Sequence, residues 1–238
     1  MTGRRDGPET GAEQTLAGRS VLVVGPGSRL TRGIAHAARD RGASVAVAST
    51  GDVADTGDAA LAWFSVTLNS EVDADRLFDR AAALCPHLDT VVAVVAPEPL
   101  GAIDELSSES WAQRVARPLR EAFWLVRRAV EGFLADAVDG RLVLVVEPLT
   151  GKNESNLVVE TGLRSFARSF AHEYGRRSLA CNLVLPGRSP TQVAPTRDPL
   201  LALIETALFL ASPAASFING EAVVVSCDSE PPVSDESA

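Results

Sequence analysis

Short runs of β-branched and other apolar residues alternate with longer helical stretches along most of the chain. Seven runs are nearly continuous in valine, leucine and alanine, at residues 20–24, 44–48, 62–66, 90–95, 141–146, 180–185 and 222–225. Strands that are buried on both faces of a parallel sheet have this composition. The segments between them predict helices at residues 32–41, 73–84, 108–134, 154–177 and 199–211.

This alternation predicts an α/β fold, a single Rossmann-like doubly wound domain whose seven-stranded parallel sheet is flanked by helices. A chain of 238 residues is long enough for one such core. We place the domain at residues 18–228. Residues 1–17 and residues 229–238, the acidic stretch SEPPVSDESA, are polar and predicted to be flexible tails.

The charge balance argues against several classes of partner. The chain carries 22 Lys+Arg against 31 Asp+Glu, a formal net charge of −9. An acidic protein repels phosphate backbones and anionic lipid headgroups, so we expect neither nucleic acid nor a membrane as a partner. The sequence has no signal-peptide pattern and no apolar run of about 18 residues, which predicts a soluble, cytoplasmic protein.

The residues that most often bind metals are scattered along the chain. They are Cys85, Cys181, Cys227, His36, His87 and His172, with no C-x-x-C pair among them. We therefore predict neither a disulfide framework nor a metal site.

Four segments together resemble the short-chain dehydrogenase/reductase family over almost the whole chain. They are VLVVGPGSRLTRGIAHAARDRGA from residue 21, DTVVAVVAP from residue 89, TGLRSFARSFAHEYGRRSLACNLVLPG from residue 161, and LFLASPAASFINGEAVVV from residue 208. The last two are similar to the interface helix and closing strand of 3-oxoacyl thioester reductases and 3-hydroxyacyl-CoA dehydrogenases. The resemblance implies the fold predicted above and a tetrameric assembly.

The dinucleotide cradle of that family, T-G-x-x-x-G-x-G after the first strand, is degenerate here. Gly25 is kept, but Arg29 and Thr31 replace the second and third glycines. A G-x-G-x-x-G pattern from Gly25 and Gly27 also fails, because Leu30 stands at its third glycine. Side chains at these positions occupy the space of a pyrophosphate. We therefore predict no cofactor.

Two further observations concern the same cradle. The second strand ends in Ala-Ser-Thr at residues 48–50, without the acidic residue that holds a ribose or the arginine that holds a 2′-phosphate. Arg29 either binds some anion or fills the empty cradle and pairs with a nearby carboxylate. We favour the second interpretation.

The catalytic tetrad implied by the resemblance is Asn, Ser, Tyr and Lys, and all four positions are replaced. They fall at Pro118, Glu147, Asn156 and Glu160. An amide does not ionise usefully, and a carboxylate repels the ribose-phosphate that an ammonium attracts. A second interpretation makes Glu147 and Glu160 a general acid/base pair, but simple replacement after loss of selection is the favoured interpretation.

A count that is independent of any resemblance leads to the same prediction. The chain has one lysine, Lys152, and one tyrosine, Tyr174, and the tyrosine follows the lysine. No Tyr-x-x-x-Lys pair exists. The segment 187–209, where the family carries a substrate lid, is also short, so we expect a rudimentary substrate pocket.

The segments that form subunit interfaces in the family are better kept than the catalytic ones. The segment 154–177 carries an apolar stripe of Leu163, Phe166, Phe170 and Tyr174, which either covers the sheet or joins an interface. The segment 108–134 has bulky apolar residues on more than one face, at Trp111, Val115, Leu119, Phe123, Trp124, Val126 and Val130. A helix that is apolar on two sides needs two partners.

Three functions remain open. The favoured one is a catalytically inactive subunit that pairs with an active family paralogue in a hetero-oligomeric dehydrogenase/reductase, expected to be a heterotetramer, with a structural or stabilising role. The first alternative is a homo-oligomeric ligand-binding or regulatory module. The second is an atypical NAD(P)-dependent oxidoreductase.

Overall fold

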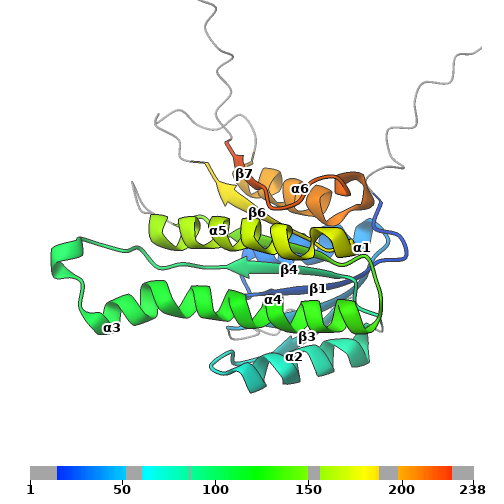
Figure 1. Ribbon diagram of the computed structural model, residues 1–238, viewed down its shortest axis with the longest axis horizontal. Coiled ribbons are helices and arrows are strands. Elements are labelled where there is room, and N and C mark those ends of the chain that lie inside the picture. The colour runs from blue at the N-terminus through cyan, green and yellow to red at the C-terminus, as the bar shows by residue number, and fades with distance from the viewer. Residues whose placement is uncertain (1–14, 52–60, 86, 150–155, 188–197, 227–238) are drawn as a thin grey trace, which may run out of the picture.

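Seven parallel strands form one sheet in the computed structural model, which describes residues 15–51, 61–85, 87–149, 156–187 and 198–226 (Figure 1). The strands are β1 (Ser20–Gly25), β2 (Ser44–Ser49), β3 (Ala62–Ser65), β4 (Thr90–Val95), β5 (Arg141–Val146), β6 (Ala180–Pro186) and β7 (Ala222–Val225). Each predicted strand lies within one residue of its observed bounds, and the predicted fold class is confirmed.

The strand order is β3-β2-β1-β4-β5-β6-β7. The chain builds outward from β1 to β3, returns to the centre, and then builds from β4 to β7 on the other side. The first residues of β1 pair in register with those of β2, Ser20 opposite Ser44, and Val21 pairs with Thr90 of β4. The order therefore reverses between β1 and β4, where the carboxyl ends of a doubly wound sheet leave a crevice.

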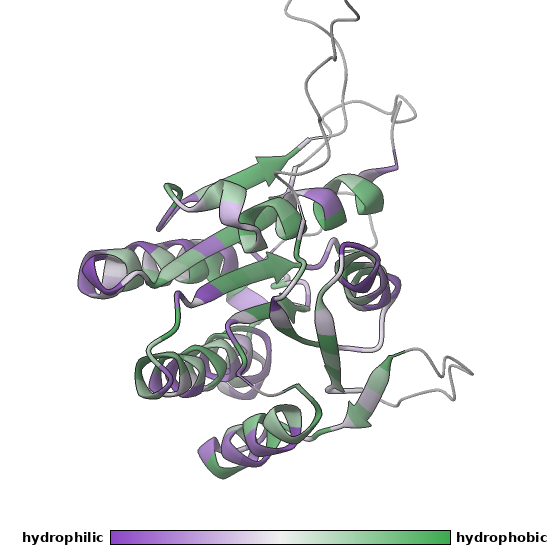
Figure 2. Cartoon of the chain, turned by 90° about the vertical axis from the view of Figure 1, so that its right-hand side faces the viewer, coloured by the Kyte–Doolittle hydropathy of each residue, from purple (hydrophilic) through white to green (hydrophobic). Residues whose placement is uncertain are grey.

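Helices cover both faces of the sheet (Figure 2). They are α1 (Arg29–Asp40), α2 (Glu71–Leu84), α3 (Ser108–Trp111), α4 (Arg117–Ala135), α5 (Leu157–Tyr174) and α6 (Pro199–Ala211). The helices α2, α4 and α5 pack on one face, and α1 and α6 pack on the other. Two apolar cores result, one on each side of the strands.

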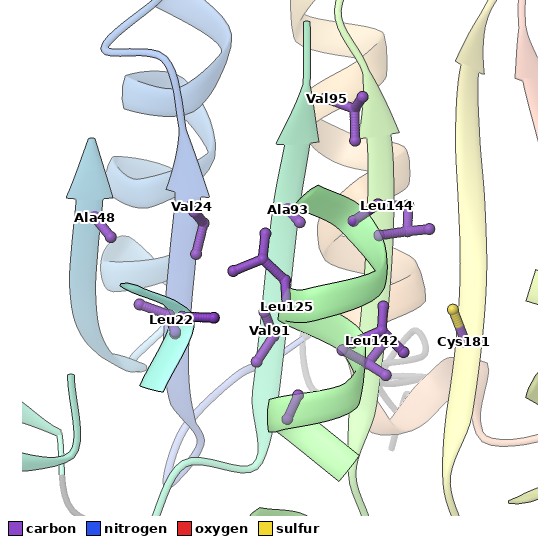
Figure 3. Close-up of a cluster of buried hydrophobic side chains, with 14 of the residues drawn as sticks. Leu22, Val24, Ala48, Val91, Ala93, Val95, Leu125, Leu142, Leu144 and Cys181 are labelled. Atoms are coloured by element: carbon purple, nitrogen blue, oxygen red, sulfur yellow. The ribbon is translucent and has the colours of Figure 1, made fainter. Parts of the chain in front are cut away.

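Alternate residues of each central strand enter different cores, because successive side chains of a strand point to opposite faces. In β1, Leu22 and Val24 pack beneath α2 and α4, whereas Val21 and Val23 pack beneath α1 and α6. Figure 3 shows the first of these cores, in which Leu22, Val91 and Leu142 from three adjacent strands lie against Leu125 of α4. Burial on both faces explains why the strands are continuously apolar in sequence.

The segment predicted to be helical at residues 108–134 is divided in the structure near Pro118, a residue type that normally kinks a helix. The structure has α3, then a π-helical turn at Ala112–Ala116, then α4. The interruption comes directly before Pro118, which cannot donate a backbone hydrogen bond to the preceding turn.

The ends of the folded chain are only partly described. Leu16 is fully buried, and its N–H donates to the Arg41 carbonyl oxygen (3.0 Å), so the packed chain includes this residue. Residues 1–14 and 227–238, which make up most of the two predicted tails, lie outside the described residues. Residues 188–197, in the segment expected to be too short for a substrate lid, also lie outside them. Within the described ranges, no helix is both long and apolar enough to cross a membrane.

Candidate functional site

The residues that the sequence singled out lie at the carboxyl ends of strands β1 and β5 and at the starts of helices α1, α4 and α5. The turn from β1 to α1 contributes Gly25, Gly27, Arg29 and Thr31, and the end of β5 contributes Glu147. Asn156 and Glu160 lie at the start of α5, and Pro118 lies at the start of α4.

A threonine side chain fills the space that glycines would leave open in the β1–α1 turn. Thr31 is fully buried, and its Oγ1 donates to the Pro26 carbonyl oxygen at 2.7 Å. A Cβ atom added to Gly25 would lie 2.7 Å from the same Oγ1 and 2.8 Å from Val94 Cβ. Gly25 is therefore required for the turn to accommodate Thr31, which is a packing role.

The N-terminal end of α1 is capped by the chain itself. Ser28 is the N-cap residue, and its Oγ accepts a hydrogen bond from the Thr31 N–H (3.3 Å). The Ser28 hydroxyl also makes a side-chain hydrogen bond with Glu147, which follows β5. The carboxyl group of a residue that follows another strand is thus brought to the N-terminal end of α1.

Glu147 is half-buried, and its environment favours the neutral acid. Burial raises the pKa of its carboxyl above the ordinary glutamate value, and the hydrogen bond with Ser28 opposes this rise only in part. The Glu147 backbone is held as well, because its N–H donates to the Val95 carbonyl oxygen at 2.8 Å.

The pyrophosphate of a dinucleotide does not fit these residues. Thr31 occupies the space over Gly25, the Thr31 N–H is already bonded to Ser28, and the ionised form of Glu147 would repel a phosphate at this helix end. Arg29, the cation nearest in sequence, is exposed. Its expected ion pair is not formed with any carboxylate of the described residues, because the side chain at this first position of α1 points to solvent.

The serine at the end of β2 also forms its hydrogen bonds within the chain. The Ser49 hydroxyl donates to the Gly51 carbonyl oxygen (3.1 Å) and accepts from the Gly51 N–H (3.4 Å). Ser49 is fully buried. This hydroxyl is therefore engaged in shaping a turn.

Asn156, at the tyrosine position of the family tetrad, is completely buried and fully hydrogen-bonded. Its Oδ1 accepts from the Val159 N–H (3.2 Å), which caps α5. Its Nδ2 donates to the Glu98 carbonyl oxygen (3.0 Å) and to the Arg114 carbonyl oxygen (2.7 Å). The amide joins α5, the segment after β4, and the turn before α4.

Pro118 explains why the Arg114 carbonyl needs a side-chain donor. In a regular helix this carbonyl would accept from the N–H four residues later, which is position 118, and proline has no N–H. The neighbouring bond is already displaced, since the Arg117 N–H donates to Ala112 across the π turn. Asn156 therefore supplies the donor that Pro118 lacks, and two tetrad positions act as one structural unit.

The charged side chains next to this unit form ion pairs with one another. Glu98 lies 3.5 Å from Arg117 and 3.9 Å from Arg114, and Arg114 Nη1 donates to the Leu100 carbonyl oxygen (3.1 Å). Glu160, at the lysine position, is half-buried in the first turn of α5, where its N–H donates to the Asn156 carbonyl oxygen (3.0 Å).

The single tyrosine cannot substitute as the acid. Tyr174 ends α5, about 27 Å along the helix from Asn156 at 1.5 Å per residue. It packs on Phe170 with ring centroids 5.0 Å apart, and burial raises the pKa of its phenol. The single lysine, Lys152, lies outside the described residues. In the described part of the chain, no group of three His, Cys, Asp or Glu side chains could hold a metal ion.

Sequence reasoning missed two participants. Ser28 links the cradle to Glu147, and its signal was present, because a serine directly before an amphipathic segment is a common N-cap. The role of the Arg114 carbonyl could not be predicted from the residue type at this position, because every residue has the same backbone oxygen.

A double-mutant cycle tests the unit of Pro118 and Asn156. Asn156→Ala leaves two carbonyls and one N–H without their partner, so we expect it to lower the free energy of unfolding by about 1–3 kcal/mol. In a Pro118→Ala background, residue 118 regains an N–H that can donate to Arg114, so the same change should cost at least about 0.5 kcal/mol less. Urea unfolding of the four proteins measures both values, and strictly additive costs would contradict the unit.

The charge of Glu147 gives a pH-dependent stability. Because burial raises its pKa in the folded state, ionisation of Glu147 opposes folding as the pH rises through that pKa. Glu147→Gln removes this cost and should make the protein more stable than wild type at pH 8. The difference should disappear below the ordinary glutamate pKa of about 4.3. Urea unfolding across this pH range checks it, and a constant difference at all pH values would argue against a raised pKa.

Comparison with known proteins agrees with the fold and the quoted segments. A family profile described as Enoyl-(Acyl carrier protein) reductase matches residues 28–199. The hydroxynaphthalene reductase-like protein Arp2 of Metarhizium guizhouense is 28% identical over 195 residues, which cover 76% of this chain and 72% of that protein. The hydroxyacyl-CoA dehydrogenase ChsB1 of Mycobacterium tuberculosis is 27% identical, with 94% of this chain and 82% of that protein covered.

Solved structures show the same architecture. A short-chain type dehydrogenase/reductase from Mycobacterium ulcerans superposes with a TM-score of 0.73 at 22% identity, covering 89% of this chain and 90% of that one. A dehydrogenase/reductase from Sinorhizobium meliloti 1021 gives 0.71 at 17% identity, with 90% and 96% covered. Taken with the profile match, these likenesses lead to one conclusion: the chain belongs to the short-chain dehydrogenase/reductase family of oxidoreductases.

Proposed function

We propose that this chain is a catalytically inactive member of its family, a subunit that pairs with an active paralogue in a hetero-oligomeric dehydrogenase/reductase and stabilises it. The observation that carries the proposal is the state of Asn156. The residue at the tyrosine position is an amide whose donor and acceptor atoms are both bonded to the protein backbone.

Carbonyl reduction by this family needs a proton donor of suitable pKa beside a bound hydride donor. An amide does not exchange protons usefully near neutral pH. The pKa of Glu147 is raised by burial, and its carboxyl group bonds to Ser28 at the end of α1. These features support a structural role for the former active site.

The two alternatives lack comparable support. An atypical oxidoreductase needs a seat for the nicotinamide dinucleotide, and the β1–α1 turn is filled by Thr31 and capped by Ser28. A ligand-binding module needs polar groups that remain available to a ligand, whereas the polar side chains of Ser49, Thr31 and Asn156 are bonded within the chain.

Nucleotide binding tests the inactivity directly. Titration of the pure protein with NADH and with NADPH, followed by nicotinamide fluorescence, should show no binding of either up to millimolar concentration. The Asn156→Tyr/Glu160→Lys variant restores the two missing side chains without emptying the β1–α1 turn, so it too should show no turnover. Binding of either dinucleotide to the wild-type protein would count against the proposed inactivity, and turnover by the variant would show that the β1–α1 turn can still hold a dinucleotide.

Native purification tests the pairing. The untagged chain, isolated from the cells that make it, should elute with a second chain of similar size whose sequence contains Tyr-x-x-x-Lys, and reductase activity should follow the pair. Elution as a stable homo-oligomer without such a chain would favour the regulatory module. Mass spectrometry of the separated subunits distinguishes the two outcomes.

A further inference from the structure

The outer side of α1 carries a row of basic side chains, although the protein as a whole is acidic. Arg29, Arg32, His36 and Arg39 follow one another at intervals of three or four residues, so they lie along one side of the helix. We call these four residues the α1 basic row. The opposite side of the helix packs into the core. Asp40 is the one acidic residue of α1, in a chain of net charge −9.

The two arginines at the start of the α1 basic row have no anionic partner. Arg39, at the far end, lies 3.1 Å from Asp40. Arg29 and Arg32 have no carboxylate within 4.0 Å among the residues that the structure describes. Arg29 is exposed, and the Nε of Arg32 is buried without a hydrogen-bond partner there. The first turn of a helix is also its positive end, so this part of the chain attracts anions.

A segment with complementary charge belongs to the same chain. Residues 227–238 contain Asp228, Glu230, Asp235 and Glu236, and no lysine or arginine. A segment that is joined to its binding surface by a short stretch of chain has an effective concentration of about millimolar. A weak ionic attraction is therefore sufficient to hold it there.

The length of this segment decides which of its carboxylates can reach α1. The strand β7, which ends at Val225, is separated from β1 by β6, β5 and β4, and all these strands are parallel. The chain thus leaves β7 at the same edge of the sheet at which α1 begins, four strand spacings or about 19 Å away. An extended chain spans about 33 Å from Val225 to Asp235 but only about 10 Å to Asp228.

We propose that the acidic residues near the end of the chain, Asp235 and Glu236, bind Arg29 and Arg32 at the start of α1. The contact lays residues 227–238 across the carboxyl edge of the sheet, in front of the turn from β1 to α1. The chain then covers with its own carboxylates the edge at which a doubly wound sheet receives a ligand. The contact lies within one chain, so it does not depend on the proposed pairing with a paralogue.

The charge of the helices favours α1 over the other site within reach. Arg164 and Arg168 on α5 are also exposed. However, α5 carries two glutamates with its two arginines, whereas α1 carries three arginines and one aspartate. The net positive charge of α1 is thus the larger, and an acidic segment is attracted to it more strongly.

Because Lys152 is the single lysine of the chain, a carbodiimide cross-link can test the contact with little background. This reagent joins an amine directly to a carboxylate that it contacts. Arg29→Lys/Arg32→Lys in the full chain keeps the positive charge and adds two amines. We expect these amines to be linked to Asp235 or Glu236, as identified by peptide mass spectrometry. The yield should fall about tenfold in about 1 M salt, where the Debye length is about 3 Å.

A matched control and an isotope mixture make the result specific. Arg164→Lys/Arg168→Lys makes the same change on α5 and should give about tenfold less linkage to residues 227–238. A mixture of ¹⁴N- and ¹⁵N-labelled chains distinguishes links within one chain, which carry a single isotope, from links between two chains. Circular dichroism verifies that each variant is folded.

Four results would overturn the proposal. They are an absence of linkage in the folded α1 variant, an equal yield in the α5 variant, links formed mainly between two chains, and links formed mainly to Asp52, Asp55 or Asp58, which follow β2 in the sequence.

Discussion

The backbone carbonyl of Arg114 constrains the whole region that would be the active site. It lies at the junction of the π turn and α4, where Pro118 removes the helical donor it would otherwise use. A backbone carbonyl left unpaired in a buried setting is costly, so a donor must come from elsewhere. Asn156 provides it, and the same side chain caps α5 and holds the segment after β4.

This arrangement gives a tetrad position of the family a structural role. A tyrosine at position 156 would need its hydroxyl free for substrate, whereas the asparagine present is buried and bonded to three backbone groups. The other end of the crevice follows the same principle. Thr31 and Ser28 bond polar atoms of the β1–α1 turn, and Glu147 brings a carboxyl group of the chain itself to the end of α1. The groups that would receive a ligand in a reductase are bonded to one another here.

The surfaces differ from the crevice in this respect. The helices α4 and α5 expose arginines and large apolar side chains that the subunit itself does not cover. Exposed apolar patches of this kind often mark sites where another molecule binds.

The fold was predictable because its signals are local or repetitive. Seven continuous apolar runs separated by helical segments leave few arrangements besides a doubly wound parallel sheet, and every strand lies within one residue of its predicted bounds. The replacement of the four tetrad residues was equally visible in the residue types at 118, 147, 156 and 160 and in the absence of any Tyr-x-x-x-Lys pair.

The contacts that the replacing residues make could not be predicted from the sequence. Prolines predict interrupted helices, but no pattern shows which side chain pairs with the freed carbonyl, because that partner is 42 residues away in the chain. The sequence by itself thus determined the architecture and the residue types at the four tetrad positions. Only the tertiary structure, by bringing α5 against the π turn, decided that Asn156 bonds the carbonyl that Pro118 leaves without a donor, because that contact joins residues far apart in the chain.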